Sequence, residues 1–234
     1  MSGTPLNGGD LAGDLELSIL GVAAREREGG SFDVLINSTR GEISAVLHPC
    51  EGKSAAVICV GGAQGGFDGP AGGLYPRLGA ALASPDALDG MSSLRLHYRQ
   101  PGEFEECVLD VLGGVSFLKG LGAQRVALVG HSFGAAVVIK AGELSDLVTG
   151  VAALSPQLYG TRTVERLSPT ALLLVHGTAD VVLNCAASQD IYDRAQEPRR
   201  LVLYAGADHT LMQCRDELFE LLREWLSEVL AEKT

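Results

Sequence analysis

The sequence VALVGHSFGAA, residues 126–136, has the pattern of a β-strand, a tight turn and a helix in succession. The apolar run ends at Val129, and a helix-forming run rich in small residues begins at Ala135. Between them lies the pattern Gly-x-Ser-x-Gly, in which a sharp turn lifts the central serine, Ser132, above a sheet. A side chain at Gly130 or Gly134 would collide with the neighbouring strand or helix. The stretch therefore predicts an exposed, reactive serine, and the flanking patterns disfavour the alternative of a flexible Gly-Ser loop.

The rest of the chain alternates short apolar runs with helical patterns. Runs that predict strands lie at residues 32–36, 43–47, 55–60, 93–97, 126–129, 150–154, 171–175 and 201–204. Most are continuous apolar runs, as in strands that are covered on both faces. Apolar stripes of helical period lie at residues 74–82, 104–118 and 218–229. This alternation predicts a doubly wound α/β domain with a mostly parallel, eight-stranded sheet.

Length and charge narrow the class of protein further. The chain has 234 residues with 18 Lys and Arg against 29 Asp and Glu, a formal net charge of −11. Such an acidic balance disfavours binding to nucleic acid or to an anionic membrane surface. We expect residues 1–14 to form a flexible tail and residues 15–234 to form a single domain. The chain shows neither a secretory signal nor a run long enough to cross a bilayer, so we expect a cytoplasmic protein.

Two later strand ends supply an acid and a base for the serine. The predicted strand at 171–175 runs into His-Gly-Thr-Ala-Asp, which places Asp180 beyond its carboxyl end. The predicted strand at 201–204 runs into Ala-Gly-Ala-Asp-His, which places His209 beyond the next carboxyl end. Such loops meet at one edge of a doubly wound sheet. A serine nucleophile needs a base, and the base needs an orienting carboxylate, so Ser132, Asp180 and His209 are predicted to form a catalytic triad.

Other polar residues have simpler interpretations. Asp208 is the main rival of Asp180 as the acid, but adjacent side chains in a turn rarely point together. His131 is expected to pack within the turn, and His176 is expected to be a structural hydrogen-bonding residue. The glycine-rich residues 61–66 fit neither a dinucleotide-binding nor a P-loop pattern, and no group of residues has metal-ligand spacing. We therefore expect no cofactor and no metal.

These motifs resemble the α/β-hydrolase superfamily over nearly the whole chain, from about Phe32 to the last helical stripe. The chain is most similar to the small, lidless branch of dienelactone-hydrolase-like proteins and simple bacterial serine esterases. Residues 155–169 are too few for the helical cap domain of other relatives. The resemblance implies that Ser132, Asp180 and His209 are nucleophile, acid and base. The chain departs from dienelactone hydrolases, which carry a cysteine where Ser132 stands.

The resemblance also implies an oxyanion hole made of two backbone N–H groups. Relatives carry His-Gly-x after the corresponding strand, and the third residue donates. Here Gly61 replaces the histidine, so Ala63 is the expected donor, with Gln64 as the alternative one residue along. Phe133, directly after the serine, is expected to supply the second N–H.

The expected reaction is hydrolysis of a small-molecule carboxylic ester or thioester through an acyl-enzyme on Ser132. Expected pocket residues are Gln157, Leu158, Tyr159 and Arg99, which offer little positive charge and favour a neutral substrate. The same triad could instead act on a lactone, a peptide or a C–C bond, or transfer an acyl group. A non-catalytic scaffold that binds a small ligand is the alternative from another class. We expect a monomer or a homodimer.

Overall fold

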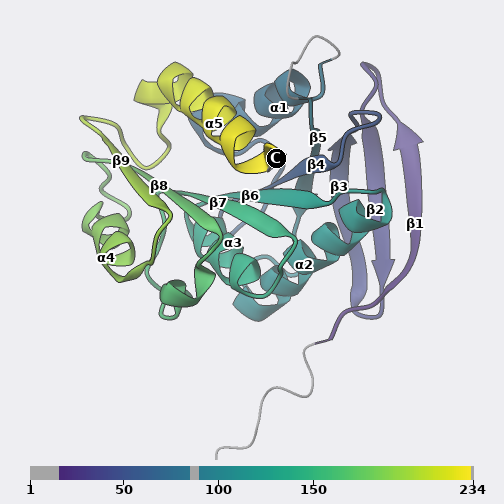
Figure 1. The fold of residues 1–234 in the computed structure, drawn as a ribbon, viewed down its shortest axis with the longest axis horizontal. Helices are drawn as coiled ribbons and strands as arrows, with labels where there is room; N and C mark the ends of the chain where they lie inside the picture. The colour runs from purple at the N-terminus through teal and green to yellow at the C-terminus, as the bar shows by residue number, and fades with distance from the viewer. Residues whose placement is uncertain (1–15, 85–89, 233–234) are drawn as a thin grey trace, which may run out of the picture.

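The computed structural model describes residues 16–84 and 90–232, and the tail predicted at residues 1–14 lies outside this part of the chain. Nine strands within it form one sheet in the order β1-β2-β3-β5-β4-β6-β7-β8-β9 (Figure 1). The strands are β1 Ile19–Glu26, β2 Phe32–Ser38, β3 Gly41–His48, β4 Ala55–Val60, β5 Ser92–His97, β6 Arg125–His131, β7 Val148–Leu154, β8 Ala171–Gly177 and β9 Arg199–Tyr204. The helices are α1 Pro70–Leu82, α2 Phe104–Gly120, α3 Phe133–Glu143, α4 Ala186–Arg194 and α5 Arg215–Leu230.

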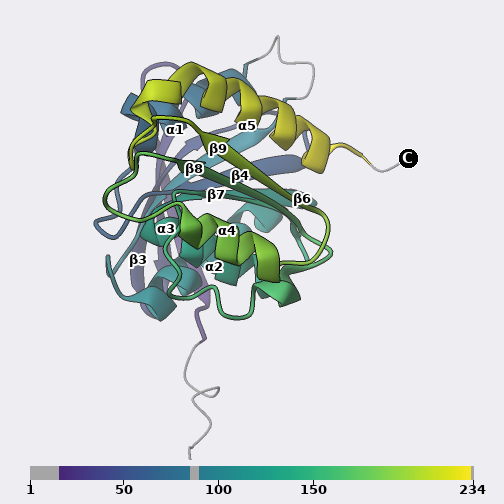
Figure 2. The ribbon, with the colours of Figure 1, turned by 90° about the vertical axis from the view of Figure 1, so that its left-hand side faces the viewer.

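The sheet is mostly parallel. The first three strands form an antiparallel meander that joins β5, and all pairs from β5 through β4 to β9 are parallel. Helices α1 and α5 cover one face, while α2, α3 and α4 cover the other (Figure 2). Alternate residues of β4 enter the two resulting cores, with Ile58 on the α2 and α3 side and Val57 on the α1 and α5 side. The predicted doubly wound architecture is confirmed.

Two elements were missed by the sequence patterns, and the predicted count of eight strands is wrong by one. The additional strand is β1, which lies at the sheet edge and pairs with β2 alone. Gly21 interrupts its apolar residues, and all of its residues after Ile19 are exposed, so its sequence differs from that of a strand covered on both faces. Helix α4 is equally weak as a pattern, because Ser188 and Ile191 are its buried residues.

The parallel strands deliver four loops to one edge of the sheet. β4 leads into the glycine-rich turn at residues 61–66, β6 into Ser132, β8 into Asp180 and β9 into His209. Residues 155–170, between β7 and β8, hold only the short 3-10 turn Val164–Leu167, so this segment supplies no helical cap. The fold thus places Ser132, Asp180 and His209 at the same ends of neighbouring strands, with no helical cap inserted between β7 and β8.

Candidate active site

Ser132 occupies a strained turn between β6 and α3. Its backbone has φ 59° and ψ −117°, a region that residues with a side chain seldom adopt and that costs about 1–3 kcal/mol. The Ser132 N–H donates to the Leu154 carbonyl at 2.8 Å, which ties the turn to the end of β7. The surrounding structure therefore stabilises a conformation that lifts the hydroxyl out of the sheet.

Both glycines of the Gly-x-Ser-x-Gly turn are required by close packing. A Cβ on Gly130 would clash with the carbonyl of Gly134, and a Cβ on Gly134 would clash with the carbonyl of Gly61. The second clash is with the turn that follows β4. Spacing along the sequence could not indicate this contact, because Gly61 and Gly134 are far apart in the chain. The glycines thus allow the serine turn and the glycine-rich turn to approach each other.

The structure brings Ser132, His209 and Asp180 into direct contact. His209 Nε2 lies 3.0 Å from Ser132 Oγ, and His209 Nδ1 lies 2.7 Å from Asp180 Oδ2. Asp180 is 8% exposed. With Nδ1 protonated toward the carboxylate, His209 presents an unprotonated Nε2 that can take the serine proton.

Asp180 is held in place by four hydrogen bonds. Its Oδ1 accepts from the Val182 and Leu183 N–H groups at 2.8 Å each, and its Oδ2 accepts from His209 and from His176 Nε2 at 3.0 Å. Burial acts to raise the pKa of Asp180, but the hydrogen bonds from Leu183, His209 and Val182 outweigh it, so the pKa lies below its ordinary value. The acid is therefore charged and fixed in orientation at neutral pH.

Two further histidines support this arrangement. His176 is fully buried, and its Nε2 lies 3.0 Å from two acceptors, Asp180 Oδ2 and the Leu183 carbonyl, so Nε2 carries the proton. Its Nδ1 then accepts from the Ser188 hydroxyl of α4 at 2.7 Å. His131 Nε2 donates to the His209 carbonyl at 2.9 Å. Burial lowers the pKa of His131 to about 4, so this ring is neutral at neutral pH. The predicted hydrogen-bonding role of His176 is confirmed, while its partner Asp180, four residues further along the chain, was not predicted.

Asp208 has a different set of partners. Its Oδ1 accepts from the Thr210 N–H at 2.8 Å and the Thr210 hydroxyl at 2.7 Å, and its Oδ2 accepts from Gln213 Nε2 at 3.0 Å. These contacts shape the turn after β9. The carboxylate that contacts His209 is that of Asp180.

Comparison with known proteins extends this description. No family model matches the chain. The uncharacterized protein YfhR of Escherichia coli is 29% identical over 104 residues, which cover 42% of this chain and 35% of YfhR. The chain thus spans about a third of the length of the curated relatives it matches.

Solved structures match over most of the chain. Dienelactone hydrolase from Anabaena variabilis superposes with a TM-score of 0.74 at 15% identity, covering 86% of this chain and 98% of that one. An alpha-beta serine hydrolase homologue from Coxiella burnetii superposes with a TM-score of 0.68 at 22% identity, covering 85% and 97%. A serine hydrolase without a lid from Xanthomonas campestris gives 0.65 at 17% identity, covering 89% and 100%.

The chain has the α/β-hydrolase fold. It resembles the lidless structures in particular, in agreement with the short segment between β7 and β8. Within this fold, the glycine-rich turn after β4 lies against the serine: a Cβ on Gly62 would lie 3.7 Å from Ser132 Cβ. Ala63 and Gln64, the two predicted donor positions, are exposed between Gly62 and Gly65.

Side chains at the end of β5 anchor that turn. The Gly66 N–H donates to His97 Nδ1 at 2.8 Å, and the Tyr98 hydroxyl donates to the Gly61 carbonyl at 3.2 Å. His97 also packs closely on Gly65, where a Cβ would meet its ring. Sequence analysis did not find this role for His97, because the contact depends on the pairing of β4 with β5.

The prediction of Arg99 as a pocket residue is wrong. Its side chain is 4% exposed and pairs with Asp110 and with Glu106, while its Nη1 donates to the Arg40 carbonyl at 2.7 Å. The guanidinium is therefore used within the protein and cannot hold a substrate. Leu158 and Tyr159 are exposed beyond β7, and Gln157 Nε2 donates to the Tyr159 carbonyl at 3.3 Å.

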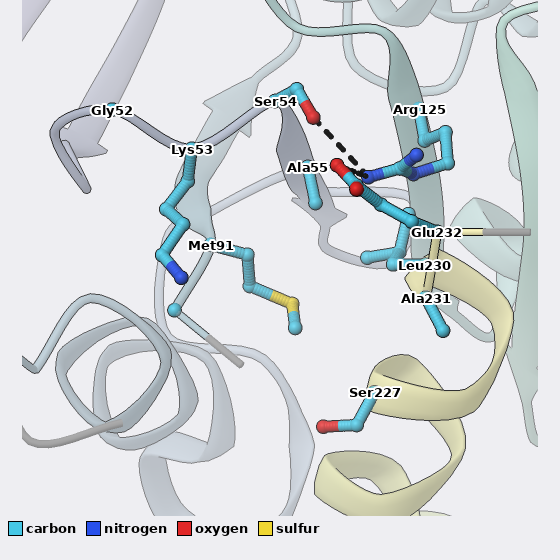
Figure 3. A pocket seen from close by; sticks show the side chains of 11 residues that line it. Gly52, Lys53, Ser54, Ala55, Met91, Arg125, Ser227, Leu230, Ala231 and Glu232 are labelled. Carbon is cyan, nitrogen blue, oxygen red and sulfur yellow. Dashed lines mark hydrogen bonds and ion pairs between the residues drawn. The ribbon is translucent and has the colours of Figure 1, made fainter. Parts of the chain in front are cut away.

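A polar cavity lies at the amino ends of β4, β5 and β6, opposite the strand ends that carry the triad. Its volume is about 330 Å³, and its walls include Lys53, Arg125, Ser227 and Glu232 (Figure 3). No predicted site residue lines it. Among residues 16–84 and 90–232, no group of His, Cys, Asp and Glu side chains could hold a metal ion. In the same residues, no helix is long and apolar enough to cross a membrane.

Proposed function

We propose that this protein is a serine hydrolase that cleaves a small carboxylic ester or thioester through an acyl-enzyme on Ser132. The observation that carries the proposal is the continuous hydrogen-bonded series from Ser132 Oγ through His209 to Asp180, with the serine on a strained turn. The solved structures named as serine hydrolases support the same class of reaction.

Acylation begins when Ser132 Oγ attacks the substrate carbonyl carbon. The serine proton passes to His209 Nε2 as the new C–O bond forms. The ionised Asp180 stabilises the resulting imidazolium through Nδ1. When the tetrahedral intermediate collapses, the bond to the leaving oxygen or sulfur breaks and His209 returns the proton to that atom.

Deacylation repeats the sequence with water. His209 takes a proton from a water molecule as its oxygen attacks the acyl carbon. Collapse of the second intermediate breaks the bond to Ser132 Oγ, which recovers the proton, and the carboxylic acid leaves. The N–H groups of Ala63, or of Gln64, and of Phe133 are proposed to hold both oxyanions; losing one such donor typically lowers kcat by about 10²–10³-fold.

A fluorophosphonate probe followed by intact-mass measurement tests the proposal. We expect a single adduct on the wild type and none on Ser132→Ala. Ser227→Ala, at the opposite cavity, is the matched control and should label like the wild type. Hydrolysis of p-nitrophenyl acetate should follow the same order. A wild type that neither labels nor turns over the ester would favour the non-catalytic scaffold.

The cytoplasmic location, the monomeric or homodimeric state and the expectation of no cofactor stay predictions. Size-exclusion chromatography with light scattering measures the oligomeric state directly.

A further inference from the structure

Several loops at the carboxyl ends of the strands, where the triad lies, carry exposed apolar side chains. The loops beyond β7, β8 and β9 contribute five of them, which we call the apolar rim: Leu158, Tyr159, Val181, Val182 and Met212. Val181 directly follows Asp180 and is 95% exposed, and Tyr159 is 65% exposed. Single exposed apolar side chains are common, but five on three loops, two of which carry Asp180 and His209, indicate a rim that can bind an apolar group.

A series of aromatic contacts connects this rim to the nucleophile. Phe133, the residue after Ser132, makes an edge-to-face contact with Phe104 at 6.0 Å between ring centroids. Phe104 makes a second such contact with Tyr159 at 5.3 Å. Phe133 is buried, Phe104 is partly buried and Tyr159 is exposed, so the three rings form an aromatic wall that runs from the buried side of the serine turn to the surface.

The wall is preformed. Gly160 has a φ of 88°, and a Cβ there would clash with the Phe104 ring, so the loop after β7 lies directly against this ring. The Thr161 hydroxyl donates to the Leu158 carbonyl at 2.8 Å and closes the loop that presents the two exposed side chains. An apolar ligand would therefore meet a surface that needs little ordering.

The charges near the wall do not favour an anionic ligand. Arg99, the cation predicted for this pocket, is used by Asp110 and Glu106. Asp208 adds a carboxylate beside His209, and the whole chain has a net charge of −11. A carboxylate or phosphate on the substrate would gain nothing from Arg99. The nearer Arg194 donates to the Thr161 carbonyl at 2.7 Å and pairs with Asp190, which leaves the exposed Arg162 as a nearby cation of this loop without a described ion pair.

We propose that the aromatic wall and the apolar rim bind the acyl chain of a neutral, medium-chain ester while its carbonyl lies at Ser132. This inference rests on the proposed function and specifies its substrate class. Full burial of one methylene is worth about fourfold in binding. A wall that covers one side of the chain should give about half of that free energy, or about twofold per methylene.

Specificity for p-nitrophenyl esters from acetate to octanoate, kept below their aggregation concentrations, tests the inference. Six added methylenes should raise kcat/KM of the wild type about 60-fold at twofold each. The double variant Leu158→Ser/Tyr159→Ser should lose about tenfold on octanoate and less than about twofold on acetate. Its matched control is Leu121→Ser/Leu144→Ser, which changes two exposed leucines that follow α2 and α3 and should keep the wild-type profile.

The outcomes separate this inference from the proposed function. A wild type that labels with fluorophosphonate and hydrolyses acetate, yet shows no gain with chain length, overturns the inference alone. The inference is also overturned if the rim variant keeps the wild-type profile or if the control variant loses it equally. Absence of both labelling and acetate hydrolysis overturns the proposed function and the inference together.

Discussion

Replacement of Asp180 by asparagine tests the arrangement of the site most directly. An asparagine has one carbonyl oxygen and one NH2 group where aspartate has two accepting oxygens. Because Val182 and Leu183 both donate to Oδ1, the new carbonyl is expected to take that position. The NH2 group then faces His209 Nδ1, which must become an acceptor. His176 Nε2 loses Oδ2 as an acceptor but keeps the Leu183 carbonyl at 3.0 Å. The ring proton consequently moves to Nε2, where it points at Ser132 Oγ.

The magnitude follows from this change of tautomer. A histidine protonated at Nε2 cannot take the serine proton, and the imidazolium also loses its counter-charge. The opposite rotamer would set the NH2 group against two backbone N–H groups, at about 1–3 kcal/mol for each unsatisfied donor. We therefore expect Asp180→Asn to lower kcat about 10³–10⁴-fold, which corresponds to about 4–5.5 kcal/mol of transition-state stabilisation.

Asp208→Asn is the matched control, since it makes the same chemical change 28 positions along the chain on a carboxylate bound to Thr210 and Gln213. Hydrolysis of p-nitrophenyl acetate and the rate of fluorophosphonate labelling measure the effect, and circular dichroism verifies folding. Asp208→Asn should stay within about threefold of the wild type. The reasoning is refuted if Asp180→Asn retains more than a tenth of the activity, or if Asp208→Asn loses as much as Asp180→Asn.

Three other perturbations have defined outcomes. His97→Leu removes the acceptor that anchors the glycine-rich turn, so kcat should fall about tenfold with little change in KM. His97→Asn, which keeps an acceptor, should recover part of the lost kcat. Equal kcat for the wild type and His97→Leu would count against the anchoring role. His131 has a pKa of 6.5 when unfolded and of about 4 when folded, so the free energy of unfolding should drop by about 3 kcal/mol as the pH falls between these values. In urea unfolding at pH 7 and pH 4.5, His131→Gln should show a smaller drop than the wild type. An equal drop would contradict this role of His131. Gly134→Ala should destabilise the fold by more than about 2 kcal/mol through its clash with Gly61, whereas Gly120→Ala, which meets open space, should be neutral or stabilising in the same urea titration.

The central part of the fold could be predicted from local patterns. Buried strands appear as continuous apolar runs, and a reactive turn must carry glycines on both sides of its serine. Parallel topology then requires every carboxyl end to lie at one edge, so Ser132, Asp180 and His209 could be grouped although they are far apart in the chain. The elements β1 and α4 were missed because few of their residues are buried, and burial is what imposes a clear apolar pattern.

The partners of individual side chains were decided only by tertiary packing. Nothing local to Arg99 indicates that Asp110 and Glu106 will neutralise it, and nothing local to His97 indicates that it receives the Gly66 N–H. Such contacts depend on strand register and on how helices seat against the sheet. Periodicity along one segment carries no information about them, because they join segments whose relative placement exists only in the folded chain.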